Sequence, residues 1–196
     1  MNTKGRLRIL HVMTKEIKLL DIPRVLDELG CDVYNANLGT KAVGFHKEDS
    51  KKLAIVIEEF KVQVVISYDF SESIAHACMI KGIPYISWVY DSPQKELYTP
   101  YAFYPCNYIF VFDKMQLKRL QDIGLKNVFF MPLAIHEKKI ARDLNLLKER
   151  HYCDVAFVGQ LYYADASETI FKNVPQKIKE ELIDCVESCY MKWGDD

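Results

Sequence analysis

Short apolar runs alternate with segments of helical spacing over the first 135 or so residues. The apolar runs predict strands at 6–12, 31–37, 62–68, 84–90, 106–112 and 127–132. Helical spacing between them predicts helices at 21–29, 50–60, 71–82 and 113–124. Buried strands in alternation with helices are typical of a parallel sheet covered on both faces. The pattern therefore predicts an α/β fold, a doubly wound Rossmann-like domain over residues 1–136 with strand order 3-2-1-4-5-6.

Residues at the expected helix ends support these boundaries. Gly30 follows the first expected helix, and Gly82 and Gly124 end two others, positions where a left-handed glycine commonly ends a helix. Asp113 and Gln116 have the spacing of a capping box at the start of the helix at 113–124. Pro132 predicts that the sixth strand lies at an edge or leaves the sheet, because proline cannot donate to the ladder.

The character of the chain changes after the sixth strand. Residues 137–152 are highly charged and are expected to form a connector. The run at 153–163 predicts a seventh strand that leads into Gly159, and 174–190 has helical spacing. Because no further strand follows, we expect residues 153–196 to be the incomplete start of a second domain, with a helical tail. An exposed apolar strand there could promote self-association.

Three of the expected strands run into an aspartate. Asp69, Asp91 and Asp113 follow the third, fourth and fifth strands at intervals of 22 residues (91 − 69 and 113 − 91). Open parallel sheets bind ligands at the carboxyl ends of their strands, so these acids are candidate site residues. Structural roles compete: Asp113 and Asp69 can cap the helices that follow, and Asp91 precedes Ser-Pro, a common turn start.

Asp91 has the sharper functional interpretation among these acids. It could be a general base that deprotonates an acceptor hydroxyl. Alternatively, the three acids could hold a divalent cation, but this is disfavoured because the first strand ends in "HVMTKE" without an acid pair. We therefore predict no metal. Other side chains near these strand ends are expected to contact the acceptor: Tyr68, Asp69, Tyr90, Ser92 and Tyr98.

Composition restricts the class of protein and its partners. The 196 residues contain 26 basic and 27 acidic side chains, which gives no strong field toward nucleic acid. No run approaches the roughly 18 apolar residues of a membrane span, and we find no signal peptide. The six cysteines form no CxxC pair, which favours reduced thiols in a cytoplasmic protein. The sequence also lacks a GxGxxG fingerprint, a P-loop and a GxSxG motif, so a dinucleotide dehydrogenase is disfavoured.

Several segments, taken in order, resemble a known family. They are "VISYDF", "GIPYISWVYDSP", "YIFVFDKMQLKRLQDIGLKNVFFMPLAI" and "DVAFVGQLYY". Together they are similar to the amino-terminal half of bacterial GT-B glycosyltransferases, in particular the CgeB-like, spore-maturation group. The resemblance extends from about residue 6 to 190. It departs from the common GT-B pattern after the first strand, where "MTKEIKLL" replaces a glycine-rich loop.

This resemblance implies a function and a second set of site residues. It implies the acceptor-binding part of an enzyme that moves a sugar from a nucleotide-diphosphate sugar to a hydroxyl on a small molecule, glycan or peptide. No tightly bound cofactor is expected, and the isolated chain would be inactive. The donor side would begin at Gly159, Gln160, Leu161 and Tyr162. A non-catalytic Rossmann-like binding or scaffolding module is the alternative.

Overall fold

The computed structural model describes residues 5–14, 21–38, 44–134, 155, 172 and 174–193. The chain divides into two compact units, Met1–Leu146 and Leu147–Asp196, which are described separately. The predicted connector at 137–152 and the seventh strand at 153–163 lie outside the described residues, apart from the exposed Val155. Gly159, Gln160, Leu161 and Tyr162 lie outside them as well.

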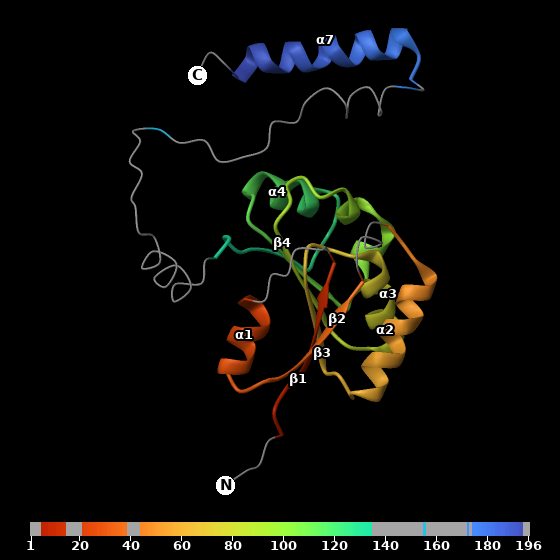
Figure 1. Cartoon of the computed structure of the whole chain (residues 1–196). Helices are drawn as coiled ribbons and strands as arrows, with labels where there is room; N and C mark the ends of the chain where they lie inside the picture. The colour runs from red at the N-terminus through yellow and green to blue at the C-terminus, as the bar shows by residue number, and fades with distance from the viewer. Residues whose placement is uncertain are drawn as a thin grey trace. The chain divides into compact units, whose positions relative to one another are not determined.

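The first unit contains one six-stranded parallel sheet (Figure 1). Its strands are β1 (Arg8–Met13), β2 (Asp32–Asn37), β3 (Val64–Tyr68), β4 (Tyr85–Val89), β5 (Asn107–Val111) and β6 (Val128–Phe130). All six lie within or close to the ranges predicted from the apolar runs. The predicted α/β class and parallel sheet are thus confirmed.

The predicted strand order is wrong, because the sheet runs β2-β1-β3-β4-β5-β6. The third strand pairs directly with the first, with Ile9 opposite Val64, and the second strand lies at the edge. The polarity of the strands explains this order. The edge strand β2 exposes Asn35 and Asn37, whereas four of the five residues of β3 are buried, as an interior position requires.

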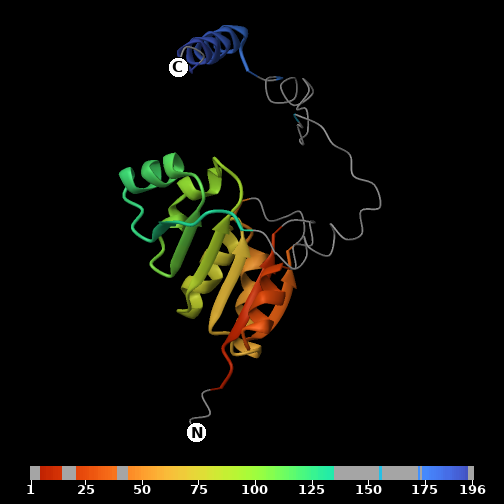
Figure 2. The same cartoon turned by 90° about the vertical axis from the view of Figure 1, so that its left-hand side faces the viewer.

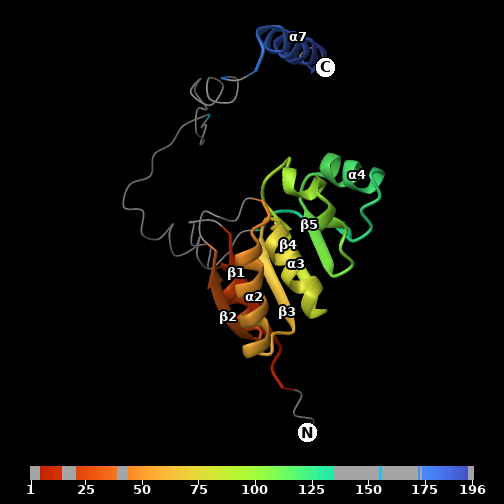
Figure 3. The same cartoon turned by 90° about the vertical axis from the view of Figure 1, so that its right-hand side faces the viewer.

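Helices cover both faces of the sheet. They are α1 (Asp21–Glu28), α2 (Lys47–Glu59), α3 (Glu72–Lys81) and α4 (Lys114–Asp122). Figure 1 shows α1 on one side of the sheet and α2 and α3 together on the other, and Figure 3 shows the α2–α3 side. The chain reverses direction across the sheet after β2, so right-handed crossovers place α1 and α2 on opposite faces.

Two short 3-10 helices between β4 and β5 were not predicted. They are η2 (Lys95–Tyr98) and η3 (Pro100–Phe103). The aromatic stretch that contains them packs against α3 through η3. Leu97 and Ala102 are buried there and belong to the main core. This connection therefore takes the place that a longer helix has in the other crossovers.

The core lies between the sheet and the α2–α3 side. Its central side chains come from alternate strand positions and from the inner faces of the helices, and include Leu10, Val65, Val89, Ile109, Val111, Leu53, Ile57, Ile74 and Leu120. Alternation along each strand leaves the other side chains on the α1 face. The two faces of the sheet are therefore distinct surfaces.

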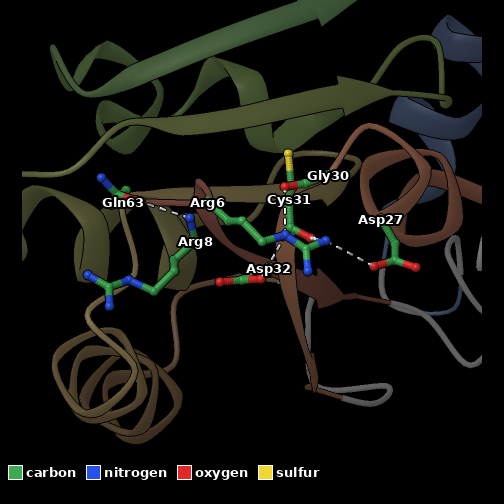
Figure 4. Close-up of polar contacts among 7 residues, drawn as sticks. All are labelled: Arg6, Arg8, Asp27, Gly30, Cys31, Asp32 and Gln63. Atoms are coloured by element: carbon green, nitrogen blue, oxygen red, sulfur yellow. Dashed lines mark hydrogen bonds and ion pairs between the residues drawn. The ribbon is translucent and has the colours of Figure 1, made fainter. Parts of the chain in front are cut away.

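The amino ends of the strands are fixed by Arg6 (Figure 4). Its guanidinium donates to the carbonyl oxygens of Gly30 at 2.8 Å and Cys31 at 3.1 Å, and forms ion pairs with Asp27 and Asp32. These contacts tie the chain that enters β1 to the turn between α1 and β2. At this edge the side chains of Asp27 and Asp32 pair with Arg6, and the side-chain oxygen of Gln63 accepts from the backbone amide of Arg8.

The second unit contributes one described helix, α7 (Gln176–Trp193), which confirms the helix predicted over 174–190. Its exposed apolar side chains include Ile178, Leu182 and Ile183. In the part of the chain that the structure describes, no helix is long and apolar enough to cross a membrane. Cys31, Cys78, Cys106 and Cys185 are free thiols.

A matched pair of isoleucines tests the position of the core. Ile109 in β5 is 1% exposed and Ile55 in α2 is 63% exposed. We expect Ile109→Ala to lower the free energy of unfolding by about 2–5 kcal/mol, because it leaves a buried cavity. Ile55→Ala should change it by less than about 0.5 kcal/mol. Urea denaturation of both variants measures the difference, and equal losses would contradict this core.

Candidate functional site

The candidate site is the edge formed by the loops that follow β3, β4 and β5. Asp69 follows β3 directly, while Asp91 and Asp113 lie just beyond the ends of β4 and β5. The three strands are adjacent and parallel, so their carboxyl ends meet at one edge. Hydrogen bonds link the loops: Asp69 to the amide of Asp91, and Ser92 to Asp113. The predicted convergence of the three acids is confirmed.

Asp69 is buried and holds two of these loops together. Its Oδ1 accepts hydrogen bonds from the backbone amides of Tyr90 at 2.8 Å and Asp91 at 3.2 Å. Its own backbone has φ +56, a left-handed conformation that aspartate tolerates better than most residues. Ser71, not Asp69, occupies the N-cap position of α3. Asp69 therefore does not occupy the cap position of α3. Its carboxylate instead accepts from the amides just beyond the end of β4.

Gln94 makes a second connection between the same loops. It is buried, and its side chain accepts from the amide of Phe70 and donates to the carbonyl of Phe70, both at 2.9 Å. A carboxamide is the side chain that can satisfy one donor and one acceptor at once. With Asp69, this arrangement gives the loop after β4 four hydrogen bonds to the loop after β3.

A buried tyrosine forms hydrogen bonds with the loop after β3 from the core side. The hydroxyl of Tyr85 lies 2.6 Å from Ser67 Oγ, accepts from the amide of Ser71 at 3.1 Å and donates to the carbonyl of Asp69 at 3.3 Å. Burial raises the pKa of Tyr85 well above its usual value, so its hydroxyl stays protonated. Sequence reasoning missed this group. The serine inside the apolar third strand was the available signal.

Asp113 is a helix cap, as its spacing predicted. Its Oδ1 accepts from the amides of Met115 at 2.7 Å and Gln116 at 3.3 Å, and its Oδ2 accepts from Ser92 Oγ at 2.6 Å. These hydrogen bonds, that of Ser92 first, lower the pKa of the Asp113 carboxyl. The amide group of the Gln116 side chain has no hydrogen-bond partner among the described residues, so the reciprocal half of the capping box does not form.

Asp91 differs from the other two acids because it is exposed. It lies beside the exposed Ser92, on the loop that Asp69 and Gln94 fix to the sheet. The side chain of Asp91 is thus exposed at the edge, and that of Ser92, also exposed, donates to Asp113. Of the three strand-end acids, Asp91 is the one placed to meet a ligand.

Three aromatic rings adjoin this edge on the α1 face. Tyr90 packs edge-on against Tyr68 and Trp88, with ring centroids 4.9 and 5.2 Å away. Burial raises the pKa of Tyr68 to about 12, and burial with the nearby Asp21 and Asp69 raises the pKa of Tyr90. Tyr68 is only 9% exposed, so its ring packs beneath the site and has little surface for contact with a ligand. Tyr98 is exposed in η2.

His11 is a buried histidine on the α1 face. Its Nδ1 lies 3.1 Å from Asn35 Oδ1, while its Nε2 is buried without a hydrogen-bond partner. Burial lowers the pKa of His11, so the ring is neutral near pH 7. Among the described residues, no group of three His, Cys, Asp or Glu side chains is arranged to hold a metal ion.

Comparisons with known proteins add little to this geometry. No family model matches the chain, and no curated protein matches it. A solved structure with some similarity is a probable glycerol dehydrogenase from Sinorhizobium meliloti 1021, with 11% sequence identity and a TM-score of 0.32. The match covers 44% of this chain and 23% of the dehydrogenase. A similarity this low carries no functional inference.

The buried carboxylate of Asp69 leads to a stability prediction. Asp69→Ala removes both acceptor bonds and places a less tolerant residue at positive φ, so we expect a loss of about 2–4 kcal/mol. Asp69→Asn keeps one side-chain oxygen and tolerates the same backbone, so its loss should be clearly smaller. Urea denaturation of the two variants, each compared with wild type, measures the contrast. Equal losses would show that neither the bonds nor the backbone conformation matters.

The lowered pKa of His11 leads to a pH prediction. Below the unfolded pKa of 6.5 the unfolded chain binds a proton that the folded chain does not, so stability falls as the pH drops from 6.5 through the lower folded value. One such group contributes at most about 1.4 kcal/mol per pH unit. His11→Gln should flatten this slope between pH 7.5 and roughly pH 5. An unchanged slope in that variant would mean that His11 takes up its proton equally in the folded and unfolded chains, which contradicts the lowered pKa.

Proposed function

We propose that the carboxyl edge of this sheet binds a hydroxyl-bearing acceptor, as the acceptor-side domain of a GT-B-type glycosyltransferase. The observation that carries the proposal is the placement of Asp91 and Ser92. Both side chains are exposed at the strand ends, on a loop fixed by buried hydrogen bonds from Asp69 and Gln94. A fixed carboxylate at this edge suits the orientation of an acceptor hydroxyl.

The chemistry that this geometry suits is general base catalysis. The acceptor hydroxyl would donate its hydrogen bond to Asp91. As the acceptor oxygen forms its bond to the anomeric carbon of the donor, the bond from that carbon to the nucleotide diphosphate breaks. The hydroxyl proton passes to the Asp91 carboxylate, and the diphosphate leaves with the bonding electrons. The donor sugar would be bound by a second Rossmann-like domain of the enzyme.

Two further observations support this proposal. The order and spacing of the segments around Asp69, Asp91 and Asp113 resemble those of GT-B amino-terminal domains. The parallel sheet also places its loops in the manner of folds that bind ligands at the carboxyl edge. The proposed location is cytoplasmic, in agreement with the free thiols of the described cysteines.

A binding module without catalysis is the second candidate function. Asp69 is buried and Asp113 caps α4, so the exposed Asp91 is the candidate base among the three. A site with this composition could bind a hydroxyl-bearing ligand without any transfer. The two functions share the same edge and differ in the chemistry performed there.

Asp91→Asn in the longest natural form of the protein tests the catalytic role. We expect kcat for sugar transfer from UDP-, GDP- or TDP-sugars to fall by about 10²–10⁴, while stability changes by no more than about 1 kcal/mol. Released nucleoside diphosphate measures turnover, and urea denaturation measures stability. Asp122→Asn, an exposed change in α4, is the matched control and should leave kcat unchanged.

The outcomes separate the two candidates. Turnover near that of wild type in Asp91→Asn would remove Asp91 from the chemistry. If no donor and acceptor pair gives transfer in the wild-type protein, although the edge still binds hydroxyl-bearing compounds, the binding module is the correct function.

A further inference from the structure

Four aromatic side chains occupy paired positions in a row across the sheet. Strand pairing places Tyr68 of β3 beside Trp88 of β4, Trp88 beside Phe110 of β5, and Phe110 beside Phe129 of β6. The rings of Tyr68 and Trp88 are stacked with centroids 6.2 Å apart, and those of Phe110 and Phe129 are tilted at 5.4 Å. Adjacent strands lie about 4.8 Å apart, so the row is about 14 Å long.

This aromatic row lies on the α1 face of the sheet. Its members alternate along the strands with Ser67, Val89 and Val111, and the two valines belong to the core on the α2–α3 side. Figure 2 views the sheet from the α1 side, with β3, β4 and β5 toward the viewer. Exposure is lowest at Tyr68, at 9%, and highest at Phe129, at 41%. The row is therefore open at its β6 end.

The aromatic row adjoins the acidic edge. Tyr90 packs against both Tyr68 and Trp88, and its backbone amide is bonded to Asp69. Asp91 and Ser92 follow it directly in the chain. Tyr90 thus links the aromatic row to the loop that carries the exposed Asp91 and Ser92.

The chemistry of this surface distinguishes between ligands that stack on aromatic rings. Single-stranded nucleic acid stacks on such rows, but the groove beside them is basic, to neutralise the phosphates. Here the adjoining loops carry the exposed Asp91 and the part-exposed Asp113, while Asp69 is buried beneath them. A sugar ring has no such charge. It has an apolar C–H face that packs on an aromatic ring and hydroxyls at its rim that donate to carboxylates.

We propose that the aromatic row is a stacking platform for a carbohydrate, and that the acceptor of the proposed transfer is therefore a glycan rather than an open-chain alcohol or a peptide. One sugar ring would lie on Trp88, with a hydroxyl directed to Asp91. The glycan would continue over Phe110 toward Phe129. This inference depends on the proposed function for the role of the ligand as an acceptor, but not for the binding itself.

Trp88 supplies a direct readout of binding. The chain has two tryptophans, Trp88 and Trp193, so Trp193→Phe leaves the fluorescence of Trp88 alone. We expect cellotriose or chitotriose to shift this emission saturably to shorter wavelength, with glucose binding more weakly because it covers one ring. Sorbitol, which has the hydroxyls but no ring, should give no saturable shift.

Two aromatic variants in the full chain test the place of binding. Phe129→Ala should weaken trisaccharide binding by about 3- to 10-fold, as expected for the loss of one stacking partner. Tyr108→Ala is the matched control. Tyr108 is 41% exposed, like Phe129, and lies on the same face opposite Ile86, outside the row. It should leave the affinity unchanged, and circular dichroism verifies that both variants fold.

Three results would overturn the proposal. The first is no saturable response to any of the sugars at their solubility limit. The second is equal weakening by Phe129→Ala and Tyr108→Ala. The third is a dimer in sedimentation that Phe129→Ala dissociates, since the face would then join two copies of the chain. Sugar binding without any transfer would contradict only the proposed function, and transfer to a non-carbohydrate hydroxyl without sugar binding would contradict only this inference.

Discussion

The hydrogen bonds accepted by the buried Asp69 carboxylate are the constraint on which the candidate site depends. A left-handed residue at the end of β3 turns the chain so that one carboxylate oxygen meets the first two amides beyond β4. Without that turn, the amides of Tyr90 and Asp91 would lose their bonds to Asp69, and the bonds of Gln94 to Phe70 would remain to join the two loops. The position of Asp91 at the edge therefore depends in part on the buried Asp69.

The two edges of the sheet use polar side chains in different ways. At the amino edge, Arg6 is bonded to backbone carbonyls and to two carboxylates, which closes the turn before β2. At the carboxyl edge, Gln94 and Tyr85 satisfy backbone groups from within. This inner support keeps the exposed residues of the loop fixed, as a preorganised site requires.

The sequence predicted the positions of the strands and helices well, but not which strands lie side by side. Apolar periodicity located all six strands, and capping-box spacing identified the role of Asp113, because both signals are local. The strand order and the role of Asp69 depend on residues far apart in the chain, such as Val64 beside Ile9 and Tyr90 beside Asp69. The polar edge strand β2 was the one signal that could have corrected the order. No local pattern indicated that the side chain of Gln94 would bond to both backbone groups of Phe70.

Hydrogen exchange at the backbone amides of Tyr90 and Asp91 tests the central claim most directly. If Asp69 fixes this loop, both amides should be protected in the wild-type protein, and Tyr90, with the shorter bond, more than Asp91. The amide of Phe70, bonded to Gln94, should be protected with them. Exchange of Tyr90 and Asp91 at the rate of an unstructured peptide, while the amide of Val65 in β3 stays protected, would contradict a preorganised edge.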